Sequence, residues 1–381
     1  MEYELGELLP YEQPADYIVE STDYDDSYKT PVLTAGKSFI IGYTNETKGI
    51  YTKLPVIIFD DFTTSSQYVD FPFKVKSSAM KILSVNSEIA DLKYLFYKMQ
   101  TIQFDSANHK RYWISEYSKI KLDLPTLAEQ QRIVNRIETM FAKLDQAQEK
   151  AQTVLDSFET RKAAILHKAF SGELTANWRK ENGVADDSWV EKTLDNCGIW
   201  ERGRSKHRPR NAPELFGGKY PFIQTGDIAN ADIYINEHKQ TLSEFGFKQS
   251  RLFPKGTLCI TIAANIGKVA ILTYDCCFPD SVVGFKPFKN VDSKFMYFKI
   301  NDIQKDLEAM APATAQKNLN LKLLTSVLVR IPSLPEQQEI VRILDTVLEK
   351  ESRAKEAAQT VLDQIALLKK SILARAFRGE L

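Results

Sequence analysis

A segment of fifty residues occurs twice in this chain of 381 residues. The first copy covers residues 125–174 and the second covers residues 332–381; they align without a gap and agree at about half of their positions. Each copy follows a longer segment of different character, so the chain reads as a module and a helix-forming segment, written twice. Such a chain can fold with internal pseudo-two-fold symmetry.

Both copies have the pattern of a long amphipathic helix. From Ile133 and from Ile340, apolar and small residues recur at alternating steps of four and three, which is the seam of a coiled coil. No Pro or Gly follows until Gly172 and Gly379, where the helices should stop. A helix of roughly 65 Å, at about 1.5 Å per residue, cannot bury its apolar stripe alone. We therefore expect the two copies to pack as an antiparallel pair.

Polar residues mark the starts of these helices and interrupt their seams. Thr126 and Ser333 each follow a proline and are expected to cap the helices, with Glu129 and Glu336 completing a capping box. Two charged seam positions are interpreted as solvent-reaching or loosely packed, with a contact to a partner as the alternative: Arg161 and Glu351.

Composition indicates a folded protein of the cytoplasm. Apolar residues make up 43% of the chain, no apolar run has the length of a membrane span, and the first four residues begin no signal peptide. The cysteines form no CxxC pair and are expected to be free thiols in a reducing compartment. They are Cys197, Cys259, Cys276 and Cys277.

Each module shows short strand patterns and one aromatic-rich helix, which predicts an α+β fold with two α/β domains joined by the long helices. In the first module a buried strand is expected at 53–59 and an exposed one at 71–76, and in the second module strands are expected at 256–262 and 269–274. Residues 93–99 and 294–300 match in type at every position and predict equivalent helices. The expected boundaries are domains at 1–124 and 189–331, helices at 125–174 and 332–381, and a linker at 175–188.

The charge is balanced overall but not between the modules. Fifty basic residues match fifty acidic ones, whereas residues 1–124 hold 13 basic and 18 acidic residues and residues 189–331 hold 20 basic and 14 acidic ones. The segment 202–210 concentrates cations around Gly203 and Pro209, so it is expected to be an exposed loop suited to phosphates. Its candidate DNA contacts are Arg202, Arg204, Lys206, Arg208 and Arg210.

In the first module, candidate DNA contacts must be gathered from several segments: Lys37, Lys74, Lys76, Lys110 and Arg111. The last two belong to a loop, 108–114, that lies over 315–321 when the repeat is extended upstream. Both loops offer groups that can reach phosphates or base edges, and a pair of solvated turns is the alternative interpretation. The candidates in the second loop are Gln316, Lys317 and Asn318.

The sequence offers no recognisable catalytic or metal site. Pro279-Asp280 is not followed by the second acid of a nuclease motif, the four histidines have no metal-ligand spacing, and there is no phosphate-binding glycine loop. Glycine-rich motifs for a methyl-donor cofactor are missing too. The chain is interpreted as a recognition protein without catalysis of its own.

Two motifs carry a family resemblance. Pro-x-Leu-x-Glu-Gln-Gln begins at Pro125 and Pro332, and Ala-Phe-x-Gly-Glu-Leu begins at Ala169 and Ala376. This order, repeated once, resembles the specificity subunit of type I restriction–modification systems. The resemblance covers nearly the whole chain and departs from the commonest pattern in a short N-terminal segment.

The resemblance implies that each module recognises half of a split double-stranded DNA site. The helices would set the distance between the halves and hold two methyltransferase subunits, while restriction subunits join to translocate and cut. It implies no cofactor on this chain, with S-adenosylmethionine, ATP and Mg on the partner subunits. The expected docking residues are the helix starts: Glu129, Gln130, Gln131, Glu336, Gln337 and Gln338.

Three alternatives belong to other classes. The chain could be a stand-alone DNA-binding protein, regulatory or architectural, although its balanced charge and long helices disfavour this. A methyltransferase or nuclease enzyme is disfavoured by the missing motifs. A coiled-coil scaffold without DNA contact would leave the basic segment 202–210 unexplained.

Overall fold

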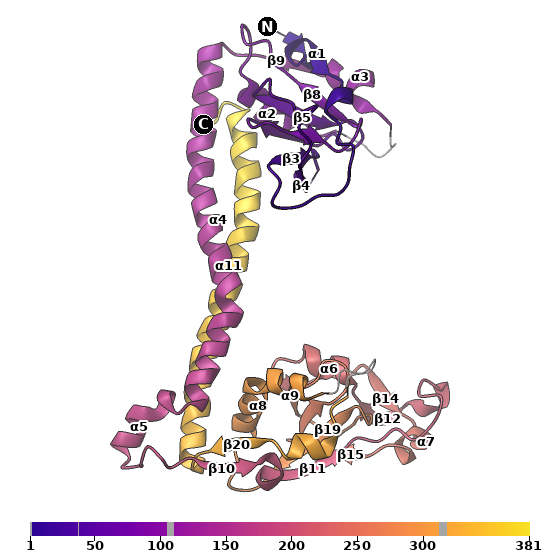
Figure 1. Ribbon diagram of the computed structural model, residues 1–381, viewed down its shortest axis with the longest axis vertical. Helices are drawn as coiled ribbons and strands as arrows, with labels where there is room; N and C mark the ends of the chain where they lie inside the picture. Colours follow the sequence, from indigo (N-terminus) through magenta and orange to yellow (C-terminus); the bar gives the residue numbers. More distant parts are fainter. Residues whose placement is uncertain (1, 37, 105–109, 312–317) are drawn as a thin grey trace. The chain divides into compact units, whose positions relative to one another are not determined.

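The structure is a computed structural model that describes residues 2–36, 38–104, 110–311 and 318–381. Two long helices run through it, α4 (Leu127–Phe170) and α11 (Leu334–Ala376) (Figure 1). The chain divides into two compact units, unit 1 with residues 1–153 and 358–381 and unit 2 with residues 154–357. Each unit therefore holds one module and a part of each long helix.

The two helices run antiparallel in both units. In unit 1 the Lys369 ammonium lies 2.6 Å from the Asp145 carboxylate, so an early part of α4 meets a late part of α11. In unit 2 the Arg161 guanidinium lies 2.8 Å from the Glu351 carboxylate. The predicted antiparallel pair is confirmed. Arg161 and Glu351, interpreted as solvent-reaching or loosely packed, are partly exposed and bind each other, a pairing that the sequence did not predict.

The helix ends follow the expected signals in part. The Thr126 hydroxyl accepts from the Glu129 amide at 3.4 Å, as a capping residue does, and Gly172 and Gly379 have φ values of 87° and 76°. The expected capping box is not completed. The Glu129 carboxylate pairs with Arg132 instead, and that of Glu336 is bound elsewhere in unit 2.

The module of unit 1 is built on small sheets. Their strand orders are β2-β8-β5-β6, β4-β3-β7 and β1-β9. The strands are β1 (Glu2–Glu4), β2 (Tyr11–Glu12), β3 (Thr30–Leu33), β4 (Ile40–Thr44), β5 (Val56–Asp60), β6 (Ser66–Val69), β7 (Lys74–Val75), β8 (Met80–Leu83) and β9 (Lys121–Asp123). The helices are α1 (Leu5–Leu8), α2 (Leu92–Met99) and α3 (Tyr112–Ser115), with 3-10 turns at Ala15–Tyr17 and Tyr117–Lys119.

The module of unit 2 repeats this plan, with one more strand in each of its two larger sheets. The orders are β11-β19-β16-β17-β13, β14-β12-β18-β15 and β10-β20. The strands are β10 (Val190–Thr193), β11 (Gly198–Arg202), β12 (Phe216–Phe222), β13 (Tyr234–Ile235), β14 (Gln240–Leu242), β15 (Leu252–Phe253), β16 (Leu258–Thr261), β17 (Val269–Leu272), β18 (Cys276–Cys277), β19 (Val282–Pro287) and β20 (Leu328–Ile331). The helices are α5 (Ala176–Glu181), α6 (Thr225–Asn230), α7 (Glu244–Lys248), α8 (Ser293–Asp302), α9 (Gln304–Met310) and α10 (Leu321–Thr325), with 3-10 turns at Glu173–Thr175, Leu194–Cys197 and Pro213–Leu215.

The central strand of each module is buried on both faces. On β5, Ile57 and Phe59 pack toward the cluster of α2, while Ile58 packs with the β3-β7 side. On β16, Ile260 joins the α8 cluster and Cys259 the opposite one. Alternating side chains point to opposite faces of a strand, so one strand connects two cores. The expected exposed strand at 71–76 is wrong: β7 is only Lys74–Val75, and both residues are buried.

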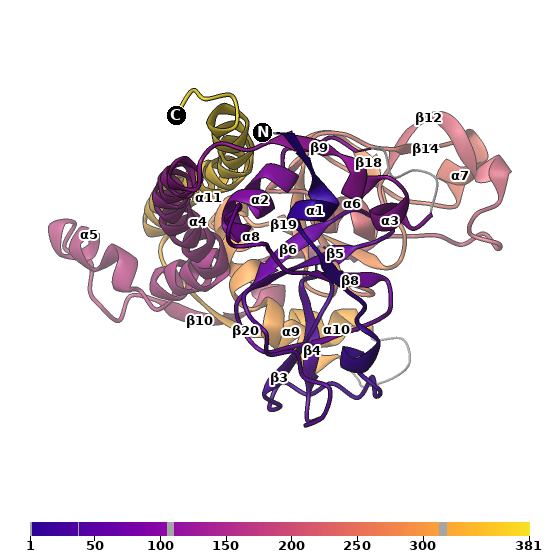
Figure 2. The ribbon, with the colours of Figure 1, turned by 90° about the horizontal axis from the view of Figure 1, so that it is seen from above.

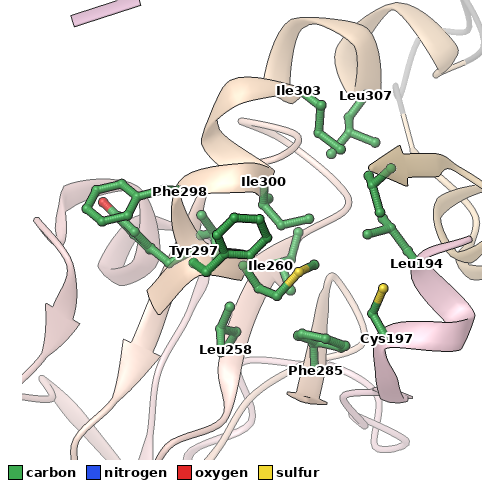
Figure 3. Close-up of a cluster of buried hydrophobic side chains, with 14 of the residues drawn as sticks. Leu194, Cys197, Leu258, Ile260, Phe285, Tyr297, Phe298, Ile300, Ile303 and Leu307 are labelled. Carbon is green, nitrogen blue, oxygen red and sulfur yellow. The ribbon is translucent and has the colours of Figure 1, made fainter. Parts of the chain in front are cut away.

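In unit 2 the larger core lies between β16, β19 and α8. Figure 3 shows Leu258, Ile260 and Phe285 from the strands meeting Ile300 of α8 and Leu194 of the preceding 3-10 turn. The ring of Phe298 lies at the margin of this cluster, on the side away from Leu194 (Figure 3). Figure 2 shows α8 beside α11 from a second direction. The core thus holds α8 in place to contact the long helices.

Candidate functional site

A glutamine in the first turn of α4 fastens the first module to this helix. The Gln130 side chain is fully buried: its oxygen accepts from the Asp91 amide at 2.8 Å, and its nitrogen donates to the carbonyls of Ile89 and Pro125 at 3.2 and 3.0 Å. Asp91 in turn caps α2 by accepting from the Tyr94 amide at 2.9 Å. One side chain therefore joins the starts of α4 and α2.

The same joint recurs at the start of α11. The Gln337 oxygen accepts from the Asp292 amide at 2.8 Å, and its nitrogen donates to the carbonyls of Asn290 and Pro332 at 3.2 and 2.9 Å. Asp292 caps α8 through the amides of Lys294 and Phe295. The middle residue of each Glu-Gln-Gln motif thus has an internal structural role. Both glutamines are fully buried, which is incompatible with the expected contact to a partner.

An ion pair lies beside each joint, about two turns further along the long helix. Lys93 of α2 pairs with Glu138 of α4, and Lys294 of α8 pairs with Asp345 of α11 at 2.7 Å. The lysines, like the acids, occupy matching positions in the two copies. Both pairs are partly exposed, so their role is mainly to fix orientation, because exposed pairs add little stability.

The Ala-Phe motif at the end of each long helix contacts the module of the other copy. In unit 2 the Phe170 ring meets Phe295 edge to face, 5.4 Å between centroids, and Lys299 lies over it. In unit 1 the Phe377 ring meets Tyr94 in the same way at 5.2 Å, and Lys98 lies over it. Each module is therefore held by the start of one long helix and the end of the other.

The first residues of the two Glu-Gln-Gln motifs differ in environment. Glu129 is partly exposed, and the hydrogen-bonded Arg132 lowers the pKa of its carboxyl. Glu336 is fully buried, where one oxygen accepts from Thr175, Arg179 and Trp189 at 2.7, 2.8 and 3.0 Å. Glu336 anchors the segment that connects the copies and is not available to a partner. Two of the six expected docking residues are exposed, and they are Gln131 and Gln338.

The basic segment of unit 2 begins where β11 ends. Gly203 is buried with its amide bonded to the Val282 carbonyl at 2.8 Å. A Cβ atom there would lie 2.2 Å from the Pro279 carbonyl oxygen, so only glycine lets the chain leave the sheet at this point. From residue 203 to 210 there is no helix or strand, as the sequence predicted.

Asp280 organises the cations of this segment. Its carbonyl accepts from Arg202, and its carboxylate pairs with Arg210 at 2.9 Å. Arg208 donates to two carbonyls within the segment at 2.8 Å. Arg204 and Lys206 are exposed, and no hydrogen bond or ion pair engages their side chains among the described residues. They are the two cations of the segment most available to an anionic ligand.

The candidate cations of the first module do not share one environment. Lys74 is 3% exposed and pairs with Glu46 at 2.8 Å, while it donates to the Lys48 carbonyl. This burial rules out the expected DNA contact, because a nucleic acid cannot reach the ammonium. Lys76, Lys110 and Arg111 are exposed.

Lys110 and Arg111 immediately precede α3, a short helix that the sequence did not predict. Lys110 pairs with Glu116, and the Arg111 guanidinium lies over the Phe62 ring. Asn318 is exposed at the equivalent place before α10. Three further candidates lie outside the described residues: Lys37, Gln316 and Lys317.

Across the described ranges, no group of three or more His, Cys, Asp or Glu side chains is placed to hold a metal ion. The cysteines are buried and unpaired. No helix in the described part of the chain is both long and apolar enough for a membrane span.

Comparison with known proteins identifies the family. The model of the type I restriction modification DNA specificity domain matches residues 1–155 and 187–361, which include both modules. The EcoR124I/EcoR124II specificity subunit of Escherichia coli is 34% identical over 362 residues, covering 90% of this chain and 85% of that protein. The MjaIX specificity subunit of Methanocaldococcus jannaschii is 31% identical over 193 residues, covering 49% and 43%.

Solved structures share the fold. A chain from a structural study of complex assembly and conformational transition in the type I R-M system has a TM-score of 0.73 at 16% identity, covering 100% of this chain and 98% of that one. The HsdS subunit from Thermoanaerobacter tengcongensis has a TM-score of 0.63 at 17% identity, covering 100% and 97%. Two family domains in one chain, with this fold, place the protein in the family of type I restriction–modification specificity subunits.

Proposed function

We propose that this chain recognises a two-part DNA site, one half with each module, and holds two methyltransferase subunits on its long helices. Restriction subunits join the same complex, which acts on DNA in the cytoplasm. The chain itself catalyses nothing, and S-adenosylmethionine, ATP and Mg belong to the partners. The observation that carries the proposal is the repeated joint: each module is fastened to both long helices through a buried glutamine and a terminal phenylalanine.

This joint supports a measuring role for the helices. A module that is hydrogen-bonded and packed onto a helix cannot turn freely. The length of the helix therefore determines where its module lies. Adding the same heptad to both helices keeps the seam in phase. Seven residues lengthen a helix by about 10 Å, at roughly 1.5 Å per residue. That length corresponds to about three base pairs, at roughly 3.4 Å per pair.

The test is to duplicate residues 147–153 in α4 and the equivalent residues 354–360 in α11, then map methylation by the complex. We expect the two half-sites to keep their sequences while the gap between them grows by about three base pairs. A control chain with the duplication in α4 alone shifts the seam of one helix against the other and should lose methylation. An unchanged gap in the doubly extended chain would refute the measuring role.

Arg204 and Lys206 are the proposed phosphate contacts of the second module, with Arg202, Arg208 and Arg210 shaping the loop that presents them. In the first module, the accessible candidates are Lys76, Lys110 and Arg111. Replacing both Arg204 and Lys206 by Gln should weaken binding to all sequences alike. The slope of log affinity against log salt should become shallower by about 0.9 per lost contact. Lys150→Gln, on the exposed face of α4, removes one charge without this effect, and an unchanged slope in the double variant would contradict the assignment.

Docking of the methyltransferases is proposed for exposed residues that are identical in the two copies, because two identical partners need two identical surfaces. Each unit presents one set on its parts of the long helices. The sets are Gln131, Lys143 and Asp363 in unit 1, and Gln338, Lys350 and Asp156 in unit 2.

Native mass spectrometry tests this docking. The wild-type chain should bind two methyltransferase subunits, and the variant Gln131→Arg/Lys143→Glu/Asp363→Arg should bind one. One subunit in a fully active wild-type complex would refute the proposal. A stand-alone DNA-binding protein would instead bind its site equally well with and without the methyltransferase, and the purified chain alone should transfer no methyl group.

A further inference from the structure

Unit 2 contains a cavity where α8 meets the two long helices. Its volume is about 450 Å³, within the range of roughly 300–1,000 Å³ that small-molecule sites occupy. Its walls come from α4, α8, α11 and the loop before β13. The apolar part of the wall is formed by Phe158, Leu166, Phe298 and Leu348.

One cation of this wall has no partner in the part of the chain that the structure describes. Lys162 of α4 is partly buried, and no hydrogen bond or ion pair engages its ammonium among the described residues. The other charges of the wall are balanced for the most part: Lys294 pairs with Asp345, and Glu349 pairs with Arg353. Asp232 is exposed, and its carbonyl accepts from the Tyr297 hydroxyl at 2.6 Å, which holds the loop against α8.

Two side chains of α4 occupy the equivalent place in unit 1: Phe141, which is partly buried, and Asp145, whose side chain is 60% exposed at the rim. Phe141 meets the ring of Tyr97 edge to face at 5.7 Å between centroids. Lys369, the counterpart of Lys162, lies over the Phe141 ring and pairs with Asp145 at 2.6 Å. The Phe141 ring thus packs against the ring of Tyr97, and the Asp145 carboxylate, one helical turn away, pairs with Lys369.

Both filling groups are missing from unit 2. Leu348 stands where Phe141 stands in the first copy, and Ser352 stands in place of Asp145. The partners of these groups remain: Phe298 is the counterpart of Tyr97, and Lys162 that of Lys369. Unit 2 therefore has the aromatic ring and the lysine that are contacted in unit 1, but it lacks the ring and the carboxylate that contact them.

We propose that this cavity binds a small molecule that carries an aromatic ring and a carboxylate. The ring would lie against Phe158, Phe298 and Leu348, as the Phe141 ring lies against Tyr97. The carboxylate would pair with Lys162, as Asp145 pairs with Lys369. Enclosure by three helices and a loop suits a small ligand, because a partner helix would need an open groove.

Isothermal titration of the full chain tests the proposal with phenylacetate as the probe. We expect one binding site in the wild-type chain and at least tenfold weaker binding of phenylacetamide, which has the ring without the charge. Hexanoate, which has the charge without the ring, should also bind at least tenfold more weakly. Absence of phenylacetate binding at millimolar concentration would overturn the proposal, and equal binding of either analogue would overturn the chemistry assigned to the site.

Two variants locate the site. Leu348→Phe/Ser352→Asp introduces the two groups that occupy the equivalent place in unit 1 and should abolish binding. The variant should still fold, because the same residues pack there in unit 1, and thermal unfolding checks this. Lys162→Met should weaken phenylacetate binding at least tenfold and leave phenylacetamide unaffected. Lys369→Met is the matched control and should change neither. Undiminished binding by the filled variant would place the ligand elsewhere and refute the site.

Discussion

In the first module, Asp61 and Lys81 form an ion pair with no solvent exposure, at 3.3 Å. In the second module, Ile262 and Val283 take the equivalent positions. Lys81 stands opposite Phe59 on β5, as Val283 stands opposite Ile260 on β16. The Asp61 carbonyl accepts from the amide of Tyr112 and the Ile262 carbonyl from that of Leu319, at 2.8 and 2.7 Å.

On the long helices the ion pair lies in unit 2 instead, and apolar residues take its place in unit 1. Arg161 and Glu351 form an ion pair in unit 2, and their counterparts in unit 1 are Leu368 and Leu144. Each ion pair is thus replaced by two apolar residues in the other copy. In the first module the ion pair is fully buried, and there a well-packed apolar pair can be close to it in stability, whereas one half of an ion pair is costly. On the long helices the exchange lies nearer the surface, because the Arg161 and Glu351 side chains are 35% and 23% exposed and Leu368 is 48% exposed. In both places the two residues of a pair differ together between the copies.

The largest predicted effect comes from breaking the buried pair in the first module. Lys81→Met leaves Asp61 as an uncompensated buried carboxylate and should lower the free energy of unfolding by about 3–5 kcal/mol. The double variant Asp61→Ile/Lys81→Val installs the residues of the second module and should recover most of this loss. Urea unfolding measures both. A double variant as unstable as the single one would show that the Asp61 contact to the Trp113 amide, at 2.7 Å, matters more than the ion pair.

The next effect concerns a contact that the two units share. Gln130→Ala and Gln337→Ala each leave buried backbone groups without partners, at about 1–3 kcal/mol per orphaned group. Because the hydrogen bonds match, the two losses should agree within about 1 kcal/mol, by thermal or urea unfolding. Gln131→Ala and Gln338→Ala are the matched exposed controls and should stay within about 0.5 kcal/mol of the wild type. Unequal losses would show that the joints differ in strength despite their geometry.

These glutamines also show where sequence reasoning stops. The repeat and its apolar seam predicted both long helices, their antiparallel packing and their stops before Gly172 and Gly379, because periodicity and glycine act locally. The inward turn of Gln130 depends on Ile89 and Asp91, some forty residues away, and no local rule states it. The available signal is that the motif containing Gln130 and Gln337 is identical in the two copies, and identity alone does not separate an internal contact from a contact with a partner.

The prediction for Lys74 as an exposed DNA contact was wrong for a related reason. Lys74 lies 28 residues from Glu46 in the chain, so only strand pairing and the fold of the module bring them together. A lysine in a short strand pattern is therefore interpreted as exposed, although Lys74 and Lys81 are both buried and paired. By contrast, the loop predicted at 202–210 is found from Gly203 to Arg210, because glycine, proline and crowded like charges exclude regular packing; Arg202 still belongs to β11, and Gly203 is buried.

A smaller effect is expected on the long helices. Arg161→Leu leaves Glu351, whose side chain is 23% exposed, without its partner in the seam. The loss should be about 1 kcal/mol, because solvent still screens the charge. Arg161→Leu/Glu351→Leu carries the residues of unit 1 and should match or exceed the wild-type stability in thermal unfolding. If the double variant is the less stable of the two, the ion pair contributes more than the apolar pair that replaces it.

The last prediction tests whether the two units open independently, and its deciding result is the small change expected from Lys81→Met. All four cysteines lie in unit 2, and burial raises the pKa of Cys276 to about 12 and that of Cys277 to about 11. Near pH 8 these thiols carry little thiolate while buried, so a thiol reagent reports the opening of unit 2. Lys81→Met, which acts in unit 1, should leave the labelling rate within about twofold of the wild type. Gln337→Ala acts in unit 2 and should accelerate it about tenfold or more, as a loss of at least 1.4 kcal/mol implies. Equal acceleration by both variants would show that the long helices make the two units unfold together.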